Sequence, residues 1–385
     1  MKNNKYSLVI VGGGAAGLSA AITYMQNNTS VEVLVLESMK ECGRKILATG
    51  NGRCNISNKN AIEYHTISDF FESIGIIFRV EEDGRAYPIS NRALSVRDAL
   101  VSACQKLDVK IQTESRVTQI SKSEEFFNVE YDKGDIHEKV QADCVLIATG
   151  GKAGPMYGSN GDGFAFARKI GHKVNTVFPA LVPINYASSV KAELTQLKGV
   201  RGKAKATLLV NREIIEIAEG EIQFTADALS GIMIFDLSRK MPKRDSSESS
   251  STTKNVIIEI DLAPDVTKKR LKEILDSNLN IGLRGIIDER LATYIEEKSK
   301  NNIDVMIELV KNFEIPVTET KGWKDAQVTK GGVSLDEINA LTGESLICKG
   351  LFFAGEVIDL DFICGGYNLS FAWSSGIRVG EWRKK

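Results

Sequence analysis

Residues 7–17 read Ser-Leu-Val-Ile-Val-Gly-Gly-Gly-Ala-Ala-Gly, an apolar run that opens directly into a glycine-rich turn. The turn matches G-x-G-x-x-G at Gly12, Gly14 and Gly17. In a dinucleotide-binding turn the first glycine permits the sharp bend, the second lets the backbone approach a pyrophosphate, and the third lets the helix pack close to the sheet. The pattern predicts a strand, a phosphate-binding turn and a helix over about 15–27, whose first amides face the phosphates.

A second apolar run at 31–36 ends at Glu37, twenty residues after Gly17. A carboxylate at this place accepts hydrogen bonds from the hydroxyls of an adenosine ribose and repels a 2′-phosphate, so the sequence favours FAD or NAD over NADP. The alternative is a glycine turn that serves only packing. The agreement of strand, spacing, helix and acid favours the dinucleotide site.

Length and composition predict a globular protein of two or three domains, because 385 residues exceed one ordinary core. The chain is 43% hydrophobic and 26% charged, with a net charge of -1. This balance disfavours nucleic acid and membrane surfaces as main partners. We expect a cytoplasmic protein, since there is no stretch of eighteen apolar residues and no signal-type cleavage pattern.

The cysteines and histidines predict no metal site. None of the six cysteines belongs to a C-x-x-C pair, and there are only three histidines. Cys42 and Cys54 raise the alternative of a redox disulfide, but their separation of twelve residues does not match the short loop of disulfide reductases.

The segment 42–58 is polar and glycine-rich, and we expect it to form no regular element. Its three cations and glycine turns suit a loop that runs along an extended anionic ligand. An ordinary surface loop is the alternative. The position directly after the ribose-binding acid favours the ligand-binding loop, because it delivers the segment to the carboxyl ends of the strands.

Further elements bring the chain back to the carboxyl ends of the predicted strands. Alternating runs at 109–112, 114–120 and 126–131 predict strands, and 142–151 is a buried strand that ends in Thr-Gly-Gly. A short strand at 351–356 ends in Gly355-Glu356, whose carboxylate suits ribityl hydroxyls. The glycine pair at 365–366 opens a final helix, whose positive end suits the pyrimidine edge of a flavin; a plain packing helix is the alternative.

Between these parts the pattern changes. Residues 181–260 are rich in strand patterns, 264–313 have helical spacing, and the polar run 246–253 is typical of a mobile loop. We therefore predict a first part of the FAD-binding domain at 1–186, an inserted β domain at 187–262, an inserted helical domain at 263–318, and the second part of the FAD-binding domain at 319–385.

Four further stretches carry a resemblance to a known family: Gly43-Arg44-Lys45 with Gly52-Arg53-Cys54-Asn55, the stretch 326–333, the stretch 354–359, and Gly365–Leu369 with 372–376. The chain resembles the BaiN-type flavoproteins, also called the aminoacetone oxidase family, nearly end to end. The resemblance implies an α/β fold: a glutathione-reductase-like Rossmann FAD-binding domain, split by a β-barrel-like domain and a small helical domain. Members oxidise amines or reduce bile-acid enones, so no substrate follows.

The resemblance also implies the cofactor-binding residues. The pyrophosphate would be held by Gly12, Gly14, Ala15, Ala16 and Gly17, the adenosine ribose by Glu37, and other parts of the cofactor by Lys45, Thr49, Gly50, Asn55, Val117, Thr149, Gly150, Gly355, Glu356, Asn368 and Leu369. The sequence departs from the family pattern at 223–231, where many relatives read Phe-Thr-His-x-Gly-x-Ser-Gly and this chain lacks the histidine and the glycine.

These observations predict an oxidoreductase that passes a hydride between FAD and a small organic substrate. Because the sequence contains no second G-x-G-x-x-G after a strand, a separate nicotinamide domain is disfavoured, and NAD(P)H is left as a transient electron donor. Oxidase and reductase both stay open, and no general base can be named. The alternative is a flavin-bearing binding or regulatory protein that contacts nucleic acid or a partner through the basic cluster at 268–272.

Two cysteines, Cys54 and Cys364, are expected near the flavin. In a reducing compartment an isolated cysteine is more often a packing residue than a nucleophile, although a helix N-terminus beside Cys364 would lower the pKa of its thiol.

Overall fold

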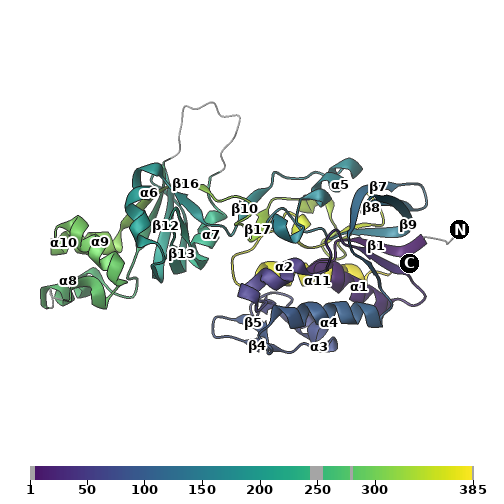
Figure 1. The fold of residues 1–385 in the computed structure, drawn as a ribbon, viewed down its shortest axis with the longest axis horizontal. Helices are drawn as coiled ribbons and strands as arrows, with labels where there is room; N and C mark the ends of the chain where they lie inside the picture. The colour runs from purple at the N-terminus through teal and green to yellow at the C-terminus, as the bar shows by residue number, and fades with distance from the viewer. Residues whose placement is uncertain (1–4, 243–254, 278–280, 384–385) are drawn as a thin grey trace, which may run out of the picture. The chain divides into compact units, whose positions relative to one another are not determined.

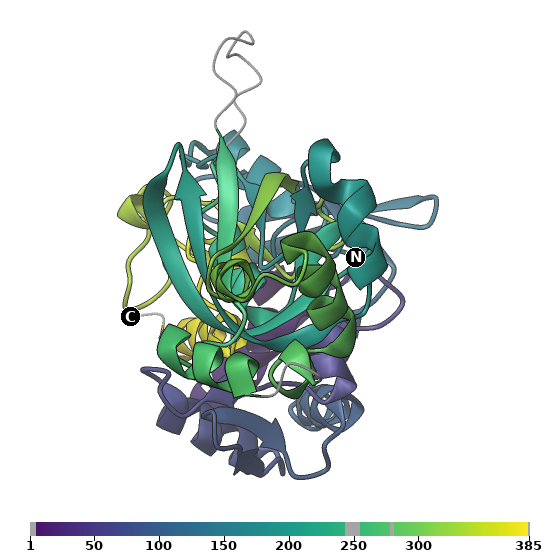
Figure 2. The ribbon, with the colours of Figure 1, turned by 90° about the vertical axis from the view of Figure 1, so that its left-hand side faces the viewer.

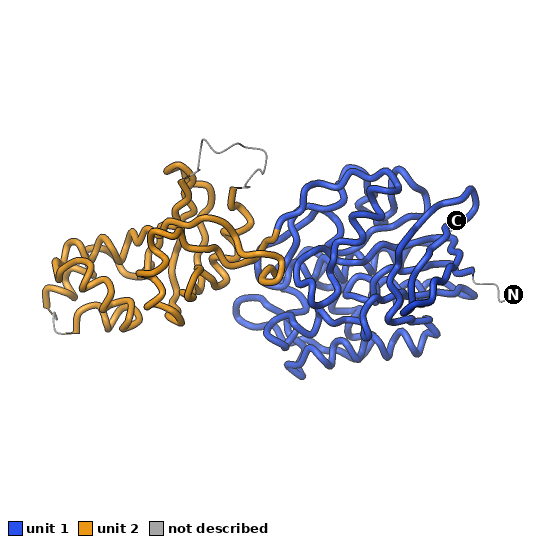
Figure 3. The backbone as a smooth tube through the Cα atoms, turned by 45° about the horizontal axis from the view of Figure 1, so that its top comes forward, with its two compact units in different colours: residues 1–178, 328–385 blue, residues 179–327 orange. Residues whose placement is uncertain are grey.

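The computed structural model describes residues 5–242, 255–277 and 281–383. The chain forms two compact units, residues 1–178 with 328–385 (unit 1) and residues 179–327 (unit 2), drawn in blue and orange in Figure 3. Unit 1 is therefore assembled from both ends of the sequence, and unit 2 is an insertion. The boundaries predicted at 187 and 318, and the division of the insertion at 262, stay predictions.

A parallel sheet forms the centre of unit 1. Its strands are β6 (Lys110–Gln112), β2 (Val33–Leu36), β1 (Lys5–Val11), β9 (Ile136–Ile147) and β18 (Leu351–Phe353), in that order. The second half of β9 pairs with both β1 and β18, so the C-terminal part of the chain completes the sheet begun by the N-terminal part. This arrangement confirms the predicted Rossmann-type α/β fold split by an insertion.

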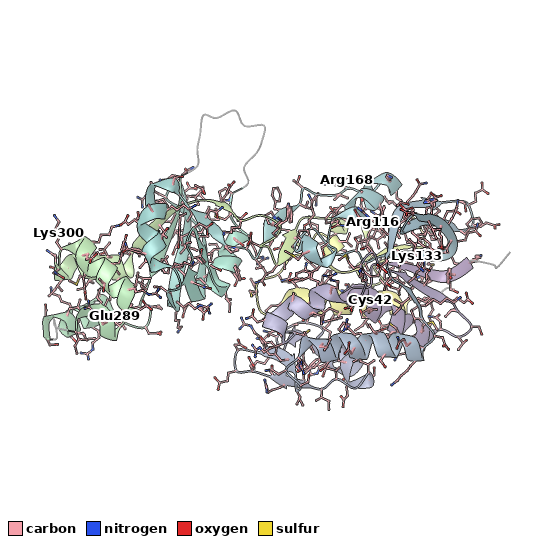
Figure 4. The ribbon with its side chains drawn as sticks, in the orientation of Figure 1. Cys42, Arg116, Lys133, Arg168, Glu289 and Lys300 are labelled. Carbon is pink, nitrogen blue, oxygen red and sulfur yellow. The ribbon has the colours of Figure 1, made fainter. Side chains whose placement is uncertain are left out.

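The first half of β9 belongs to an antiparallel extension. It pairs with β8 (Phe127–Lys133), which pairs in turn with β7 (Ser115–Lys122). Arg116 of β7, labelled in Figure 4, forms an ion pair with Asp162 at the start of α5 (Asp162–Ile170). The three predicted alternating runs are thus found as β6, β7 and β8.

Helices and loops cover both faces of the parallel sheet, which explains why its strands are apolar without alternation. Leu8 and Ile10 point to the face covered by α1 (Ala15–Asn27), α4 (Ala93–Lys106) and α11 (Tyr367–Glu381). Val9 and Val11 point to the opposite face, where they belong to the same core as Phe164 of α5. Successive residues of a strand face opposite sides, so one short run fills two cores.

The prediction that 42–58 holds no regular element is wrong. Arg44–Ala48 forms the short helix α2, and a 3-10 turn follows at Thr49–Gly52. Gly43 is in the left-handed conformation (φ 71°) and its N–H donates to Gly13 O, which starts α2 directly beside the glycine turn. Arg44–Ala48 consists mostly of good helix formers, but the hydrogen bond from Gly43 to Gly13 that starts the helix is not visible in the sequence pattern.

The remaining elements of unit 1 are short. They are β3 (Ser57–Asn58), α3 (Tyr64–Ser73), β4 (Phe78–Val80), β5 (Arg85–Pro88), β17 (Val328–Lys330) and several 3-10 turns, with β10 (Phe178–Ala180) at the boundary of the two units. Strands β3, β5 and β4 form a small antiparallel sheet.

Unit 2 contains a closed barrel with the strand order β11-β14-β13-β12-β15-β16. The barrel strands, teal to green in Figure 2, are β11 (Ile184–Tyr186), β12 (Arg201–Val210), β13 (Glu213–Phe224), β14 (Ala228–Ser230), β15 (Val256–Asp261) and β16 (Phe313–Thr320). The helices are α6 (Ser188–Leu194), α7 (Ile232–Ser238), α8 (Lys268–Ser277), α9 (Glu289–Ser299) and α10 (Ile303–Lys311). Barrel and helices share one apolar core. The inserted barrel and helical elements confirm the predicted fold class.

The polar run 246–253, predicted to be mobile, lies outside the described residues. Within the described ranges, none of the helices combines the length and apolar character that a membrane span requires.

Helix α11 packs along α1 in unit 1 (Figure 1), and Gly376 makes the closest approach. A Cβ at Gly376 would overlap Ser19 Oγ and the carbonyl oxygen of Ala16. We expect Gly376→Ala to lower the free energy of unfolding by about 1–3 kcal/mol, the cost of overpacking a close contact. Urea denaturation measures this change, with Gly202→Ala as control because nothing lies within 4 Å of a Cβ there. Equal stability of the two variants would contradict the packing argument.

Candidate flavin site

The glycine turn after β1 has the geometry of a phosphate cradle. Gly12 has φ 108°, and a Cβ there would lie 2.5 Å from the carbonyl oxygen of Ala148. A Cβ at Gly17 would overlap the carbonyl oxygen of Gly12, whereas nothing lies within 4 Å of a Cβ at Gly14. The first turn of α1, which includes Ala15 and Ala16, has no side-chain cap. Free amides beside open space suit the pyrophosphate of a dinucleotide.

The carboxylate of Glu37 is held beside this turn. Glu37 Oε2 accepts from the N–H of Gly13 at 2.8 Å, and Oε1 accepts from the N–H of Met39 at 2.8 Å and the hydroxyl of Ser38 at 3.3 Å. A carboxylate offers about four acceptor sites, so these bonds orient it and leave capacity for a ribose hydroxyl. The side chain is buried with these partners, as a fixed recognition group should be.

Helices α1 and α11 run parallel, so their positive ends point the same way. Trp373 O accepts from Ser19 Oγ at 3.2 Å, Gly376 lies against Ala16, and Gly380 lies against Thr23. Because Gly376 of α11 lies beside Ala16 of α1, the N-terminus of α11 extends past the N-terminus of α1. The overhang is about seven residues, or roughly 10 Å. Two helix N-termini separated along one direction suit a cofactor with a pyrophosphate at one place and an electron-accepting ring further along.

Lys45 and Glu356, predicted separately, form an ion pair. Lys45 Nζ lies 2.6 Å from Glu356 Oε2, and Glu356 Oε1 accepts from the N–H of Thr329 at 2.8 Å. Gly355 (φ 75°) precedes this acid, and a Cβ there would lie 3.0 Å from Ala16 Cβ. The structure therefore brings the Gly355-Glu356 step, α2 and the start of α1 together.

The predicted loop residues Thr49, Gly50 and Asn55 connect α2 to the start of α11. Thr49 Oγ1 donates to Ile46 O at 2.7 Å, and Gly50 is left-handed (φ 56°). The side-chain amide of Asn55 donates to Ser57 O at 2.9 Å and accepts from the N–H of Gly366 at 3.1 Å. Asn55 thus holds the residue that begins α11, a role that its sequence position does not reveal.

Three predicted residues lie beside the glycine turn and Glu37. Thr149 follows β9, and its Cα would lie 3.1 Å from a Cβ at Gly12; Gly150 is left-handed (φ 70°). Val117 is buried in β7, two residues after Ser115, whose N–H donates to Glu37 O at 2.8 Å.

The side chain of Asn368 is used within the protein. Its Oδ1 accepts from the N–H of Phe362 at 2.9 Å, and its Nδ2 donates to Phe362 O at 2.9 Å. These bonds orient the side chain of Asn368, and the backbone amides of Asn368 and Leu369 lie in the first turn of α11.

Sequence reasoning missed two residues that hold this site. The N–H of Gly355 donates to Ser375 Oγ at 2.9 Å, and the hydroxyl of Thr329 accepts from Lys152 and Ala153. Ser375 lies eight residues into α11 and Thr329 in a short strand. Both residues lie in stretches that carry the family resemblance, 326–333 and 372–376, but neither contact could be read from sequence, because the partners are 20 residues apart for Ser375 and at least 176 apart for Thr329.

Four cysteines are buried, Cys42, Cys54, Cys104 and Cys144, whereas Cys348 and Cys364 are partly exposed. Cys54 is fully buried, and burial raises the pKa of its thiol to about 12. Burial and the nearby Glu37 likewise raise the pKa of Cys42, labelled in Figure 4, to about 12. Both thiols are therefore protonated at neutral pH and poor nucleophiles.

The segment 223–231, where the sequence departs from the family pattern, lies in unit 2. Asp227 pairs with Lys321 at 3.0 Å, which holds the pKa of this carboxyl below its usual range. Thr225 Oγ1 accepts from the N–H of Ala228 at 3.0 Å, so hydrogen bonds and an ion pair order a turn that contains neither the histidine nor the glycine.

Fold and site together define a Rossmann-type flavoprotein. The model of the HI0933-like protein Rossmann domain matches residues 6–68 and 62–382, and the chain belongs to this family. It is an FAD-dependent oxidoreductase, as the resemblance to BaiN-type flavoproteins predicts.

The chain is similar to two curated proteins over nearly their whole lengths. It is 32% identical to the 3-dehydro-bile acid delta(4,6)-reductase of Clostridium scindens, covering 97% of each chain. It is 29% identical to the ribosomal RNA dihydrouridine synthase of Haemophilus influenzae, covering 95% of this chain and 96% of that one. Among solved structures, an open flavocytochrome c3 fumarate reductase has a TM-score of 0.53 at 14% identity, covering 98% of this chain and 78% of the other; it shares the fold.

We expect Glu37→Ala to weaken FAD binding about ten- to a hundredfold. The reason is the loss of charge-assisted hydrogen bonds, which contribute about 1.5–3 kcal/mol. Fluorescence titration of the apoprotein with FAD measures the dissociation constant. Ser38→Ala, which removes only the longer 3.3 Å bond, serves as control and should stay within about threefold of the wild type. Unchanged affinity in Glu37→Ala would contradict the ribose assignment.

We expect Cys54→Ser and Cys364→Ser to retain FAD and most turnover. Because the pKa of Cys54 is raised to about 12, its thiol stays protonated from pH 7 to pH 9, and iodoacetamide should leave it unmodified by mass spectrometry. A loss of more than about a hundredfold in kcat, some 2.7 kcal/mol, with an unchanged flavin spectrum would place that thiol in the chemistry.

Proposed function

We propose that this protein reduces a carbon–carbon double bond conjugated to a carbonyl group in a small organic substrate, with NAD(P)H as transient electron donor. The observation that carries the proposal is the full-length similarity to the bile-acid reductase. The name of that relative describes a ketone at position 3 and reducible double bonds at positions 4 and 6. A cytoplasmic location stays a prediction.

The residues of the chain supply position and electrostatics. Bound FAD would supply the hydride chemistry. The glycine turn and α1 would hold the pyrophosphate, Glu37 the adenosine ribose, and the Lys45–Glu356 pair the ribityl region. The first amides of α11 would face the pyrimidine edge, where their dipole favours negative charge.

Both ring nitrogens of His172 are used in hydrogen bonds within unit 1. His172 is buried between Glu337, 3.1 Å from Nδ1, and Ser345, 2.8 Å from Nε2. Burial lowers the pKa of His172, so this imidazole is neutral at pH 7. A conjugated carbonyl already polarises its double bond, so the protein would mainly supply orientation: the β-carbon would receive a hydride and the α-carbon a proton from solvent. These two additions account for the two hydrogen atoms that the product gains.

A second candidate is reduction of uridine in RNA. The dihydrouridine synthase relative favours it, and the uracil ring presents the same kind of bond, a double bond conjugated to a carbonyl. The net charge of the chain favours a small-molecule substrate over RNA. The net charge is -1, whereas RNA binding depends on phosphate neutralisation by lysine and arginine.

The basic cluster at 268–272 gives little support to a nucleic-acid-binding role. In α8, Lys268 pairs with Glu308 at 2.6 Å, Arg270 with Glu273 at 3.1 Å, and Lys272 with Asp304 at 2.7 Å. These acids offset the charges of three of the four cations. Two of the ion pairs connect α8 to α10 and the third lies within α8, which explains the cluster as a solvated helix face.

The test is anaerobic turnover of the purified FAD-loaded protein with NADH or NADPH. We expect the flavin absorbance to fall with the nucleotide and to recover on addition of a 3-keto-4-ene or 3-keto-4,6-diene steroid, with a product two hydrogen atoms heavier. Dihydrouridine formed in a ribosomal RNA fragment, with no steroid reduction, would favour the second candidate. Consumption of amines with oxygen alone would identify an oxidase, and a colourless protein that FAD cannot reconstitute would contradict the cofactor.

A further inference from the structure

Thr329 connects three segments of the candidate flavin site. The residue is fully buried in β17. Its hydroxyl oxygen accepts from the N–H of Lys152 at 2.7 Å and from that of Ala153 at 3.0 Å, in the turn after β9. Its own N–H donates to Glu356 Oε1 at 2.8 Å, while Glu356 Oε2 pairs with Lys45. One residue therefore orients both the acid and the turn.

The chemistry of this position requires a hydroxyl. The backbone N–H groups of Lys152 and Ala153 point at the same atom, Thr329 Oγ1. A hydroxyl oxygen has two lone pairs, so it can accept both hydrogen bonds. A valine has the same shape but no acceptor, so the N–H groups of Lys152 and Ala153 would lose this acceptor, and the bond from Ala153 is buried.

The surroundings leave no room for an alternative arrangement. A Cβ at Gly151 would overlap Thr329 Oγ1 and lie 2.6 Å from Glu356 Oε1. Just beyond Thr329, Gly331 (φ 89°) and Gly332 (φ 142°) run between two backbone segments, and a Cβ at Gly332 would lie 2.6 Å from Val357 O. These close contacts hold β17 and the two glycines after it in one position beside Glu356.

We propose that Thr329 is a positioning residue of the flavin site, which fixes the carboxylate of Glu356 and the turn 150–153 before the cofactor binds. The inference rests on the proposed role of Glu356 at the ribityl chain. Preorganisation raises affinity because a side chain that is already oriented loses less entropy on binding.

The test measures FAD dissociation constants by fluorescence titration of the apoproteins. We expect Thr329→Val to raise the constant about tenfold or more, and Thr329→Ser, which keeps the hydroxyl, to stay within about threefold of the wild type. Thr23→Val is the matched control: Thr23 is buried in α1, and its Oγ1 has no hydrogen-bond partner within the described part of the chain. A wild-type constant in Thr329→Val would overturn the proposal.

A double-mutant cycle separates the two contacts of Thr329. Valine keeps the backbone N–H that Glu356 Oε1 accepts, so the loss in Thr329→Val comes from the turn 150–153 and should still be about tenfold in a Glu356→Ala background. A loss below about threefold in that background would overturn the proposal. Should Thr329→Val not fold, Gly151→Ala, which displaces both Thr329 Oγ1 and Glu356 Oε1, must raise the constant about tenfold, and wild-type affinity would overturn the proposal. Failure of the wild type to bind FAD would instead contradict the proposed site.

Discussion

The close approach of α11 to α1 is the constraint on which unit 1 depends. Glycines of α11 form the contact: Gly376 lies against Ser19 and the backbone of Ala16, and Gly380 against Thr23 and the backbone of Ala20. On its other side α1 lies against the glycine turn, where Gly17 contacts the carbonyl oxygen of Gly12. Because α1 is held between the sheet and a helix from the opposite end of the chain, the N-termini of both helices lie at the carboxyl ends of the strands.

Acidic side chains then have defined places around those helix ends. Glu37 and Glu356 each accept a hydrogen bond from a backbone amide at 2.8 Å, and Glu356 also pairs with Lys45. A partly buried carboxylate is costly without such partners, so its hydrogen bonds both stabilise the fold and orient the group. Cofactor recognition and folding therefore depend on the same contacts.

The predicted cofactor residues all belong to unit 1, whereas the segment that departs from the family pattern belongs to unit 2. The two curated relatives carry names for different substrates at similar length. One fold can host several functions, because function depends on the residues of the site. In this chain the Asp227–Lys321 pair gives the departing turn a different charge distribution from that of a histidine.

Much of the first half of the site was predictable from local sequence. Gly12, Gly14 and Gly17 follow one strand, and Glu37 ends the next, so spacing alone places the acid beside the phosphate turn; the structure agrees, with Gly13 donating to Glu37. The alternating and apolar runs likewise predicted the strands of the sheet, because a side-chain period of two or a continuous apolar run is a local property. Local pattern failed at α2, whose start depends on a hydrogen bond from Gly43 to Gly13.

Tertiary structure decided the contacts between distant segments. Lys45 meets Glu356, Asn55 meets Gly366, and Thr329 meets the turn after β9 across at least 176 residues. The sequence determined a flavin-type Rossmann unit and an insertion, and it predicted a set of cofactor residues. Packing alone decided which of those side chains pair with each other, and that Asn368 donates to Phe362. Hydrogen-bond partners depend on distance in space and leave no periodic signal in the chain.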